Sequence, residues 1–141
     1  MNAKASVIVP SLGRYERLRD CVRSIVNQRT TFPFEVVLVI DGPDSEQIRK
    51  KILSEFGSFP GLSFDVSSDR RGSPQAKNAG ARVARGEILV FVDDDVIARD
   101  GWLEAIVSAH EDGIAGAGGA EAKLRKRDLL RRIWFLVRGG A

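Results

Sequence analysis

"EILVFVDDDV", residues Glu87 to Val96, joins a strand-forming apolar run to three adjacent carboxylates. The run from Glu87 to Val92 is continuous and rich in β-branched and aromatic residues, which is typical of a strand covered on both faces, as in a parallel sheet. The three aspartates that follow repel one another, and aspartate is a poor strand former. We therefore expect a bound cation to compensate their charge.

Strand and helix patterns alternate along the rest of the chain. Ser6–Pro10 and Glu35–Ile40 are further continuous apolar runs, and Leu62–Val66 and Gly113–Gly119 are weaker strand candidates. Two stretches between them carry apolar side chains at the spacing of one helix face. These residues are Leu18, Cys21, Val22, Ile25 and Val26 in one stretch, and Ile48, Ile52, Leu53 and Phe56 in the other.

Capping residues predict where several helices begin and end. Asp44 is expected to cap the second helix, which Gly57 should terminate. Ser73 is expected to cap a third helix, with Pro74 as its first helical residue. Another helix is expected to begin at Trp102.

This alternation predicts βαβ units with right-handed crossovers, and hence an α/β sandwich around a mainly parallel sheet. In such sheets ligands bind beyond the carboxyl ends of the strands. The segments that follow the first, second and fourth predicted strands are polar or turn-forming, namely "PSLGR", "DGPD" and "DDDV". We expect them to converge at one edge of the sheet.

Composition is that of a single globular domain, with 141 residues, of which 43% are hydrophobic and 29% charged. One cysteine, Cys21, excludes an internal disulfide, and the apolar run near the N-terminus is too short for a signal peptide. No stretch approaches the roughly 20 apolar residues of a membrane span. A cytoplasmic location is therefore expected.

The net charge of +3 is unevenly distributed. Between Lys123 and Arg138 seven basic residues and one acidic residue carry a charge of +6, so the remainder of the chain sums to −3. The basic character thus belongs to the tail, and no nucleic acid partner is expected for the body of the domain.

The acidic cluster and Asp41 are the first candidate site residues. Alternation along a strand would place Asp93 and Asp95 on one side, with Asp94 pointing elsewhere. Carboxylates of this kind suit Mg²⁺ or Mn²⁺ together with substrate phosphates, and the alternative is a solvated acidic turn. Asp41 could accept a hydrogen bond from a nucleobase N–H or a ribose hydroxyl, or could simply form a turn with the glycine and proline that follow it.

Basic residues surround the predicted start of the third helix. Arg70, Arg71 and Lys77 would reinforce the attraction of a helix N-terminus for a diphosphate. Arg14, after the first strand, has the same potential. The alternative for all four is a solvated surface position.

Together, "SVIVPSLGR", "EVVLVIDGPDS", "RRGSPQAKNAGARVARGEILVFVDDDV" and "GWLEAI" resemble, in this order and spacing, the nucleotide-binding N-terminal portion of a family 2 glycosyltransferase. The resemblance implies a Rossmann-like GT-A fold, a three-layer sandwich with a mainly parallel central sheet. It also implies that residues 1–120 form a nucleotide-sugar-binding half-domain, truncated relative to family domains.

The resemblance also implies roles for individual residues and a reaction. The reaction is metal-dependent transfer of a sugar from a UDP- or GDP-linked donor to a glycan, lipid or protein hydroxyl, with inversion and with Mn²⁺ or Mg²⁺ as cofactor. Pro10 and Ser11 would line the nucleotide pocket, and Asp41 would contact the base. The diphosphate would lie near Arg14, Arg71 and Lys77. The ribose or sugar would be approached by Asp93 and Asp94, and the metal would be bound by Asp95 together with Asp93.

Two other functions are weighed against transfer. One is a non-catalytic nucleotide-sugar binding module, or a fragment that needs a partner chain for activity. The other is a nucleotidyltransferase, which would be expected to carry a glycine-rich basic loop after the first strand, and "PSLGRYER" fits that poorly.

The chain departs from the family pattern in several places. Leu12-Gly13 stands where Tyr-Asn is common, which removes a stacking partner for the base, and Ile40 replaces the first acid of the usual pair. "HEDG", residues 110–113, follows the acidic cluster too closely to be the later acidic motif and is interpreted as a helix end. No catalytic base is assigned.

The tail, residues 121–141, is predicted to be a basic amphipathic helix. Leu130, Ile133, Trp134 and Val137 have helical spacing among the basic residues. Such a helix would either contact anionic lipid at the inner face of the membrane or pack against the missing half or a second copy of the chain.

Overall fold

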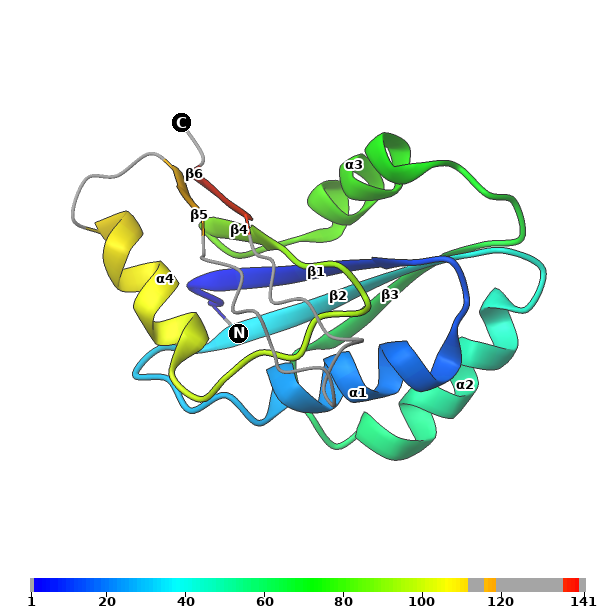
Figure 1. The fold of residues 1–141 in the computed structure, drawn as a ribbon, viewed down its shortest axis with the longest axis horizontal. Helices are drawn as coiled ribbons and strands as arrows, with labels where there is room; N and C mark the ends of the chain where they lie inside the picture. The colour runs from blue at the N-terminus through cyan, green and yellow to red at the C-terminus, as the bar shows by residue number, and fades with distance from the viewer. Residues whose placement is uncertain (1, 112–115, 119–135, 140–141) are drawn as a thin grey trace, which may run out of the picture.

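The computed structural model describes residues 2–111, 116–118 and 136–139. A single sheet with the strand order β3-β2-β1-β4-β6-β5 forms its centre (Figure 1). The elements are β1 (Ala5–Ser11), α1 (Tyr15–Val26), β2 (Phe34–Asp41), α2 (Ser45–Phe56), β3 (Leu62–Ser67), α3 (Ser73–Val83), β4 (Ile88–Phe91), α4 (Trp102–Glu111), β5 (Gly116–Gly118) and β6 (Leu136–Gly139).

Strands β1 to β4 form the parallel part of the sheet. β1 lies between β2 and β4, with Val7 opposite Val36 on one side and Val90 on the other. β3 extends the sheet beyond β2, and β6 pairs with β4 in the antiparallel direction. The mainly parallel sheet expected from the continuous apolar runs is therefore confirmed.

Helices cover both faces of this sheet and create three layers. Figure 1 shows α3 on one side of the sheet, with α1 and α2 on the other. The buried residues of α4 belong to the same apolar cluster as those of α1 and α2. The three-layer α/β architecture expected from the sequence is confirmed.

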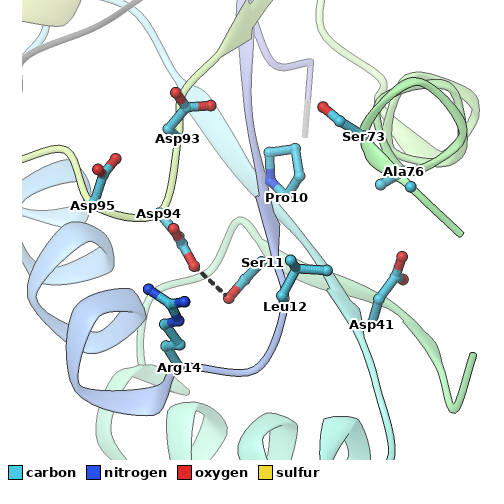
Figure 2. A pocket seen from close by; sticks show the side chains of 11 residues that line it. Pro10, Ser11, Leu12, Arg14, Asp41, Ser73, Ala76, Asp93, Asp94 and Asp95 are labelled. Carbon is cyan, nitrogen blue, oxygen red and sulfur yellow. Dashed lines mark hydrogen bonds between the residues drawn. The ribbon is translucent and has the colours of Figure 1, made fainter. Parts of the chain in front are cut away.

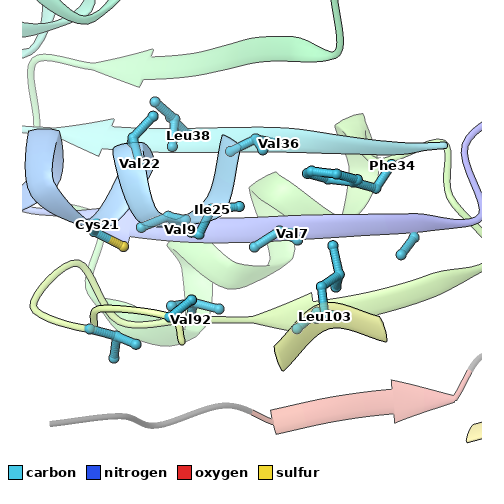
Figure 3. Packing of buried hydrophobic residues seen from close by; sticks show 14 of the residues in the cluster. Val7, Val9, Cys21, Val22, Ile25, Phe34, Val36, Leu38, Val92 and Leu103 are labelled. Atoms are coloured by element: carbon cyan, nitrogen blue, oxygen red, sulfur yellow. The ribbon is translucent and has the colours of Figure 1, made fainter. Parts of the chain in front are cut away.

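The larger apolar cluster lies between the sheet and helices α1, α2 and α4 (Figure 3). Val7 and Val9 of β1 and Leu38 of β2 contribute from the sheet, and Val22 and Ile25 contribute from α1. All five side chains have no exposed surface. At roughly 25 cal/mol per Å² of apolar area, burial of this kind is the main favourable term in the stability of the fold.

The opposite face is covered by α3 through small side chains. Ile8, Val37 and Val39 of the sheet pack against Ala76 and Ala79 of the helix. Small residues allow the helix to lie close to the strands. A consequence for the site is that the first turn of α3 comes close to the carboxyl end of β2.

Helix boundaries agree with the predictions to within one residue, and among the predicted cap residues only Ser73 does not occupy its expected position. α3 begins at Ser73, so Gly72, with φ of 86°, occupies the N-cap position expected for Ser73. Asp44 is the N-cap of α2, but its side chain makes no capping hydrogen bond. α2 ends before Gly57 as expected, although the φ of Gly57 is −62° and not left-handed.

Most of the tail lies outside the described residues. Of the helix predicted over residues 121–141, the structure describes only Leu136–Gly139, and this segment is strand β6 rather than helix. In "HEDG", the first two residues end α4, in agreement with the interpretation as a helix end. Among the described residues, no helix has the length and apolar character needed to cross a membrane.

Gly80 tests the close packing of α3 on the sheet. A Cβ atom at this position would overlap Ile8 and would lie 3.0 Å from a methyl group of Val39. Gly80→Val is therefore expected to lower the free energy of unfolding by about 1 to 3 kcal/mol, the usual cost of overpacking. Urea denaturation of the full chain, followed by circular dichroism, measures this.

Asn78→Val is the matched control, because Asn78 is exposed on the same helix. Its effect should stay within about 0.5 kcal/mol. An equal loss of stability in both variants would assign the cost to the helix propensity of valine and contradict the packing explanation.

Candidate functional site

A cavity of about 380 Å³ lies at the carboxyl ends of the parallel strands. It is formed where the segments after β1, β2 and β4 meet the start of α3, so the polar strand endings do converge (Figure 2). The lining residues are Pro10, Ser11, Leu12, Arg14, Asp41, Gly72, Ser73, Ala76, Asp93, Asp94 and Asp95.

The acidic cluster lies in a turn just beyond β4. The last ladder contact is the hydrogen bond from the Val92 N–H to the Ile8 carbonyl, and the N–H of Val96 then bonds to the carbonyl of Asp93. Because the chain has left the strand, alternation of side chains no longer applies. All three aspartates line the cavity, and in Figure 2 the carboxylate of Asp94 points toward Ser11, away from those of Asp93 and Asp95.

Asp94 is held inside the cavity by Ser11. The hydroxyl of Ser11 donates a hydrogen bond of 2.8 Å to Asp94 Oδ2, as the dashed line in Figure 2 shows. Partial burial raises the pKa of the Asp94 carboxyl, and the hydrogen bond from Ser11 opposes this rise. Asp95 also raises that pKa, whereas Arg17 and Arg14 lower it. The end of β1 is thereby joined directly to the acidic turn.

Helix α1 supports the segment that carries the acids. The Cys21 thiol lies 3.6 Å from the carbonyl of Asp93, and the Ser24 hydroxyl accepts the N–H of Ala98 at 3.0 Å. Gln28, which is buried, donates to the carbonyl of Arg99 at 2.8 Å. Burial raises the pKa of the Cys21 thiol, so the thiol stays protonated and acts as a packing group.

Asp41 lines the opposite side of the cavity, at the end of β2, and is 1% exposed. It is paired with Arg71, whose Nη2 lies 2.6 Å and Nε 2.9 Å from Asp41 Oδ1. The backbone N–H of Arg71 donates to Asp41 Oδ2 at 3.1 Å. Nη1 of the same guanidinium donates to Asp65 at 2.7 Å. The hydrogen bond with Asp41 is the main cause that raises the pKa of Arg71.

The structure brings together most of the residues singled out from the sequence. Three of those residues, Arg70, Arg71 and Lys77, do not line the cavity, and Arg71 instead contacts the two carboxylates described above. Sequence reasoning reached seven lining residues, which are Pro10, Ser11, Arg14, Asp41, Asp93, Asp94 and Asp95.

Sequence reasoning missed Gly72, Ser73 and Ala76 as lining residues and Asp65 as a partner of Arg71. It had also treated Leu12 only as a departure from a pattern, whereas this residue is 55% exposed and lines the cavity. The charged Asp65 within the strand run Leu62–Val66 was the signal that could have indicated a basic partner nearby.

The donor set fits a divalent cation that arrives with a phosphate ligand. In the part of the chain that the structure describes, no three or more His, Cys, Asp or Glu side chains are preassembled to hold a metal. Mg²⁺ and Mn²⁺, however, take only one or two protein carboxylates when substrate phosphates complete their coordination. Asp93 and Asp95, both lining the cavity, supply such carboxylates.

Comparison with known proteins identifies the class. The model of the family "Glycosyl transferase family 2" matches residues 6–129. This region contains the parallel strands, except for Ala5 at the start of β1, and the cavity. The chain belongs to glycosyl transferase family 2.

Comparison with individual glycosyltransferases agrees with this family assignment. The chain is 32% identical over 120 residues to a glucosyl-dolichyl phosphate glucuronosyltransferase of Haloferax volcanii, covering 82% of this chain and 37% of the relative. It resembles the mannosyltransferase PcManGT of Pyrobaculum calidifontis, solved with GDP-Man and Mn²⁺, with a TM-score of 0.70 and 23% identity, covering 86% and 36% of the two chains.

A third comparison is with S. aureus TarS 1-349 solved with UDP-GlcNAc. The TM-score is 0.62 at 27% identity, and the match covers 77% of this chain and 32% of TarS. The similarity to PcManGT establishes the fold alone, which agrees with the GT-A type predicted from the sequence. This chain therefore spans about a third of the length of each of these proteins.

Removal of Arg71 tests how much the ion pair with Arg71 stabilises the buried Asp41 carboxylate. Asp41 and Arg71 have side chains that are 2% and 22% exposed. Arg71→Ala is expected to lower the free energy of unfolding by about 3 kcal/mol, because one charge of a mostly buried pair loses its partner. Denaturant unfolding of the full chain measures the loss, and Arg70→Ala, at the exposed neighbouring position, is the matched control.

A double variant separates charge from packing. Asp41→Asn in the Arg71→Ala background should recover part of the lost stability, since the unpaired carboxylate is then neutral. If the double variant were no more stable than Arg71→Ala alone, the loss would come from the packing of the arginine stem.

Proposed function

We propose that this domain binds a nucleoside diphosphate sugar and that the whole protein transfers the sugar to an acceptor hydroxyl. The observation that carries the proposal is the convergence of a buried acceptor, Asp41, with three carboxylates and a helix start around one cavity. The cavity volume of about 380 Å³ lies in the usual range for small-ligand sites. Membership of glycosyl transferase family 2 supports the same reaction.

The base and ribose are proposed to lie between Asp41, Pro10 and Ser11. Asp41 is an acceptor for a base N–H, and Leu12 provides apolar surface beside it. Leu12 has no aromatic ring to stack on the base, so hydrogen bonding at Asp41 has the larger part in recognition.

The diphosphate is proposed to lie between the acidic turn and the start of α3. Ser73 follows Gly72 at the first turn of α3, where unpaired N–H groups favour an anion, and Arg14 adds a positive charge. Asp95 and Asp93 would hold Mn²⁺ or Mg²⁺ here, which neutralises charge on the departing diphosphate when it is bound. Asp94, oriented by Ser11, is proposed to face the ribose or sugar.

Transfer is proposed to proceed with inversion, with a carboxylate base that accepts the proton of the acceptor hydroxyl. Neither the base nor the acceptor site is assigned to residues of this chain. The acceptor is proposed to be a lipid-linked glycan, because the relative from Haloferax volcanii is named for a dolichyl phosphate compound and because the tail is basic. Contact of the tail with the inner face of the membrane belongs to the same proposal.

The second candidate is a nucleotide-sugar binding module that has no activity by itself. It is considered because the match covers 37% of the glucuronosyltransferase and no catalytic base has been assigned. Release of nucleoside diphosphate from the donor by the full chain alone, with an acceptor present, would contradict this candidate.

Donor binding tests the proposal directly. We expect UDP or GDP, and the corresponding sugar conjugates, to bind only with Mn²⁺ or Mg²⁺ present, because the ion joins the diphosphate to the acidic turn. Asp95→Ala should weaken the metal-dependent binding by at least tenfold, the loss of about one charge-assisted contact. Isothermal titration calorimetry with each nucleotide, with and without the metal, gives both affinities.

Asp100→Ala is the matched control, since it removes an exposed aspartate of the same segment that does not line the cavity. It should bind as the wild type does. Absence of binding by any nucleotide to the wild type would overturn the proposed function, and equal weakening in both variants would contradict the role of Asp95.

A further inference from the structure

A buried amide, Gln28, holds the connecting segment, residues 96–103, which leads from the acidic turn into α4. Gln28 follows the C-terminus of α1 and is 7% exposed. Its Nε2 group donates to the carbonyls of Arg99 at 2.8 Å and Ser24 at 3.2 Å, and its Oε1 accepts the N–H of Leu103 at 3.2 Å. The two carbonyls and the N–H around the amide therefore fix its orientation.

The contact with Leu103 is a helix cap that another element supplies. The first N–H groups of a helix have no partner inside that helix. Leu103 is the second residue of α4, which begins at Trp102, so its N–H is one of these groups. The carbonyl of Arg99 accepts both the N–H of Trp102 and the amide of Gln28. Gln28 thus joins the start of α4, and the turn before it, to the end of α1.

Gln28 is the last of three contacts along one side of α1. Cys21 and Ser24 precede it at helical spacing and contact the carbonyl of Asp93 and the N–H of Ala98. As the residue number rises along α1, the number of the contacted residue rises as well. The acidic turn and the connecting segment therefore run alongside α1.

The acidic turn is thereby fixed at both ends. On one side the N–H of Val92 bonds to the carbonyl of Ile8, which is the last contact of the strand with β1. On the other side Ser24 anchors Ala98, and Gln28 anchors the residue that follows it. The two carboxylates assigned to the metal lie between these anchors, so their separation depends on them.

We propose that Gln28 and Ser24 are positioning residues whose hydrogen bonds fix the separation of the carboxylates in the acidic turn and so set its selectivity among divalent ions. The proposal rests on the proposed function and adds what makes the site discriminate between small and large ions. Neither residue lines the cavity, so both act through the backbone that they hold.

Ion size links these anchors to selectivity. Mg²⁺ requires nearly ideal octahedral geometry with oxygen ligands at about 2.0–2.1 Å, whereas Ca²⁺ takes about six to eight ligands at about 2.3–2.6 Å in flexible geometry. A turn held at both ends keeps Asp93 and Asp95 at one separation and resists expansion around a larger ion. Without the anchors the turn can widen, which weakens binding with the smaller ions more than binding with Ca²⁺.

Nucleotide binding with different ions tests the proposal on the full chain. Isothermal titration calorimetry measures the affinity for UDP or GDP, whichever the wild type binds, with Mn²⁺, Mg²⁺ and Ca²⁺ in turn. The readout is the affinity with the better of the first two ions divided by the affinity with Ca²⁺, which should be at least about tenfold in the wild type. The fitted stoichiometry reports the folded fraction separately, so a loss of folded protein does not change this ratio.

Gln28→Met is expected to lower the ratio by roughly three- to tenfold, at or below the lower end of the effects of groups that orient metal ligands. It removes the hydrogen bonds of the amide without changing the charge near the acidic turn and keeps an unbranched side chain of similar size. Ser24→Ala removes the contact with Ala98 and is expected to lower the ratio by a smaller factor. If Gln28→Met does not fold, Ser24→Ala decides.

Ile52→Ala is the matched control. Ile52 is buried on α2 in the apolar cluster that also contains the buried residues of α1, so this change lowers stability. It removes no hydrogen bond to the connecting segment, and the ratio should equal that of the wild type. Circular dichroism of each variant confirms that folded protein is compared.

Three outcomes are distinguishable. A reduced ratio in Gln28→Met, or in Ser24→Ala if the first does not fold, with an unchanged ratio in Ile52→Ala supports the proposal. Nucleotide binding with no ion preference in the wild type, with an unchanged ratio in the deciding variant, or with an equal reduction in Ile52→Ala overturns it and leaves the proposed function intact. Failure of the wild type to bind any nucleotide overturns the proposed function, and the inference with it.

Discussion

The central position of β1 is the constraint on which the rest of the structure depends. β1 pairs in parallel with β2 on one side and β4 on the other, and its side chains from Ala5 to Val9 have no exposed surface. Two parallel neighbours oblige the chain to return through helices each time, which covers both faces. They also place the carboxyl ends of all three strands at one edge, so the polar segments after them must meet there.

The two faces of the sheet contribute differently to the site. α1 packs through larger side chains and supports the acidic turn with contacts from Cys21, Ser24 and Gln28. α3 packs through alanines and Gly80, which brings its first turn close to the end of β2. The cavity is thus bounded by carboxylates on one side and by a helix start and Asp41 on the other. This division fits a ligand that has both an anionic part and a hydrogen-bonding base.

Much of this arrangement was predictable from local patterns. The apolar runs identified the strands, and the rule that ligands bind at the carboxyl ends of parallel strands located Pro10, Ser11, Asp41 and the acidic cluster in one cavity. The errors arose where a local rule depended on where an element ends. Capping was misassigned at Ser73 because Gly72 takes the N-cap position, and the alternation rule does not apply to the turn that carries Asp94 because the chain leaves the strand before it.

The sequence by itself determined the layered α/β fold and the family, because burial on both faces requires continuous apolar strands and the site residues follow directly after them. Only the tertiary structure decided what those residues contact. The bond between Ser11 and Asp94 and the row formed by Asp41, Arg71 and Asp65 join segments far apart in the chain. The physical reason is that charge pairing and direction depend on distances of about 3 Å, and no local pattern specifies those distances.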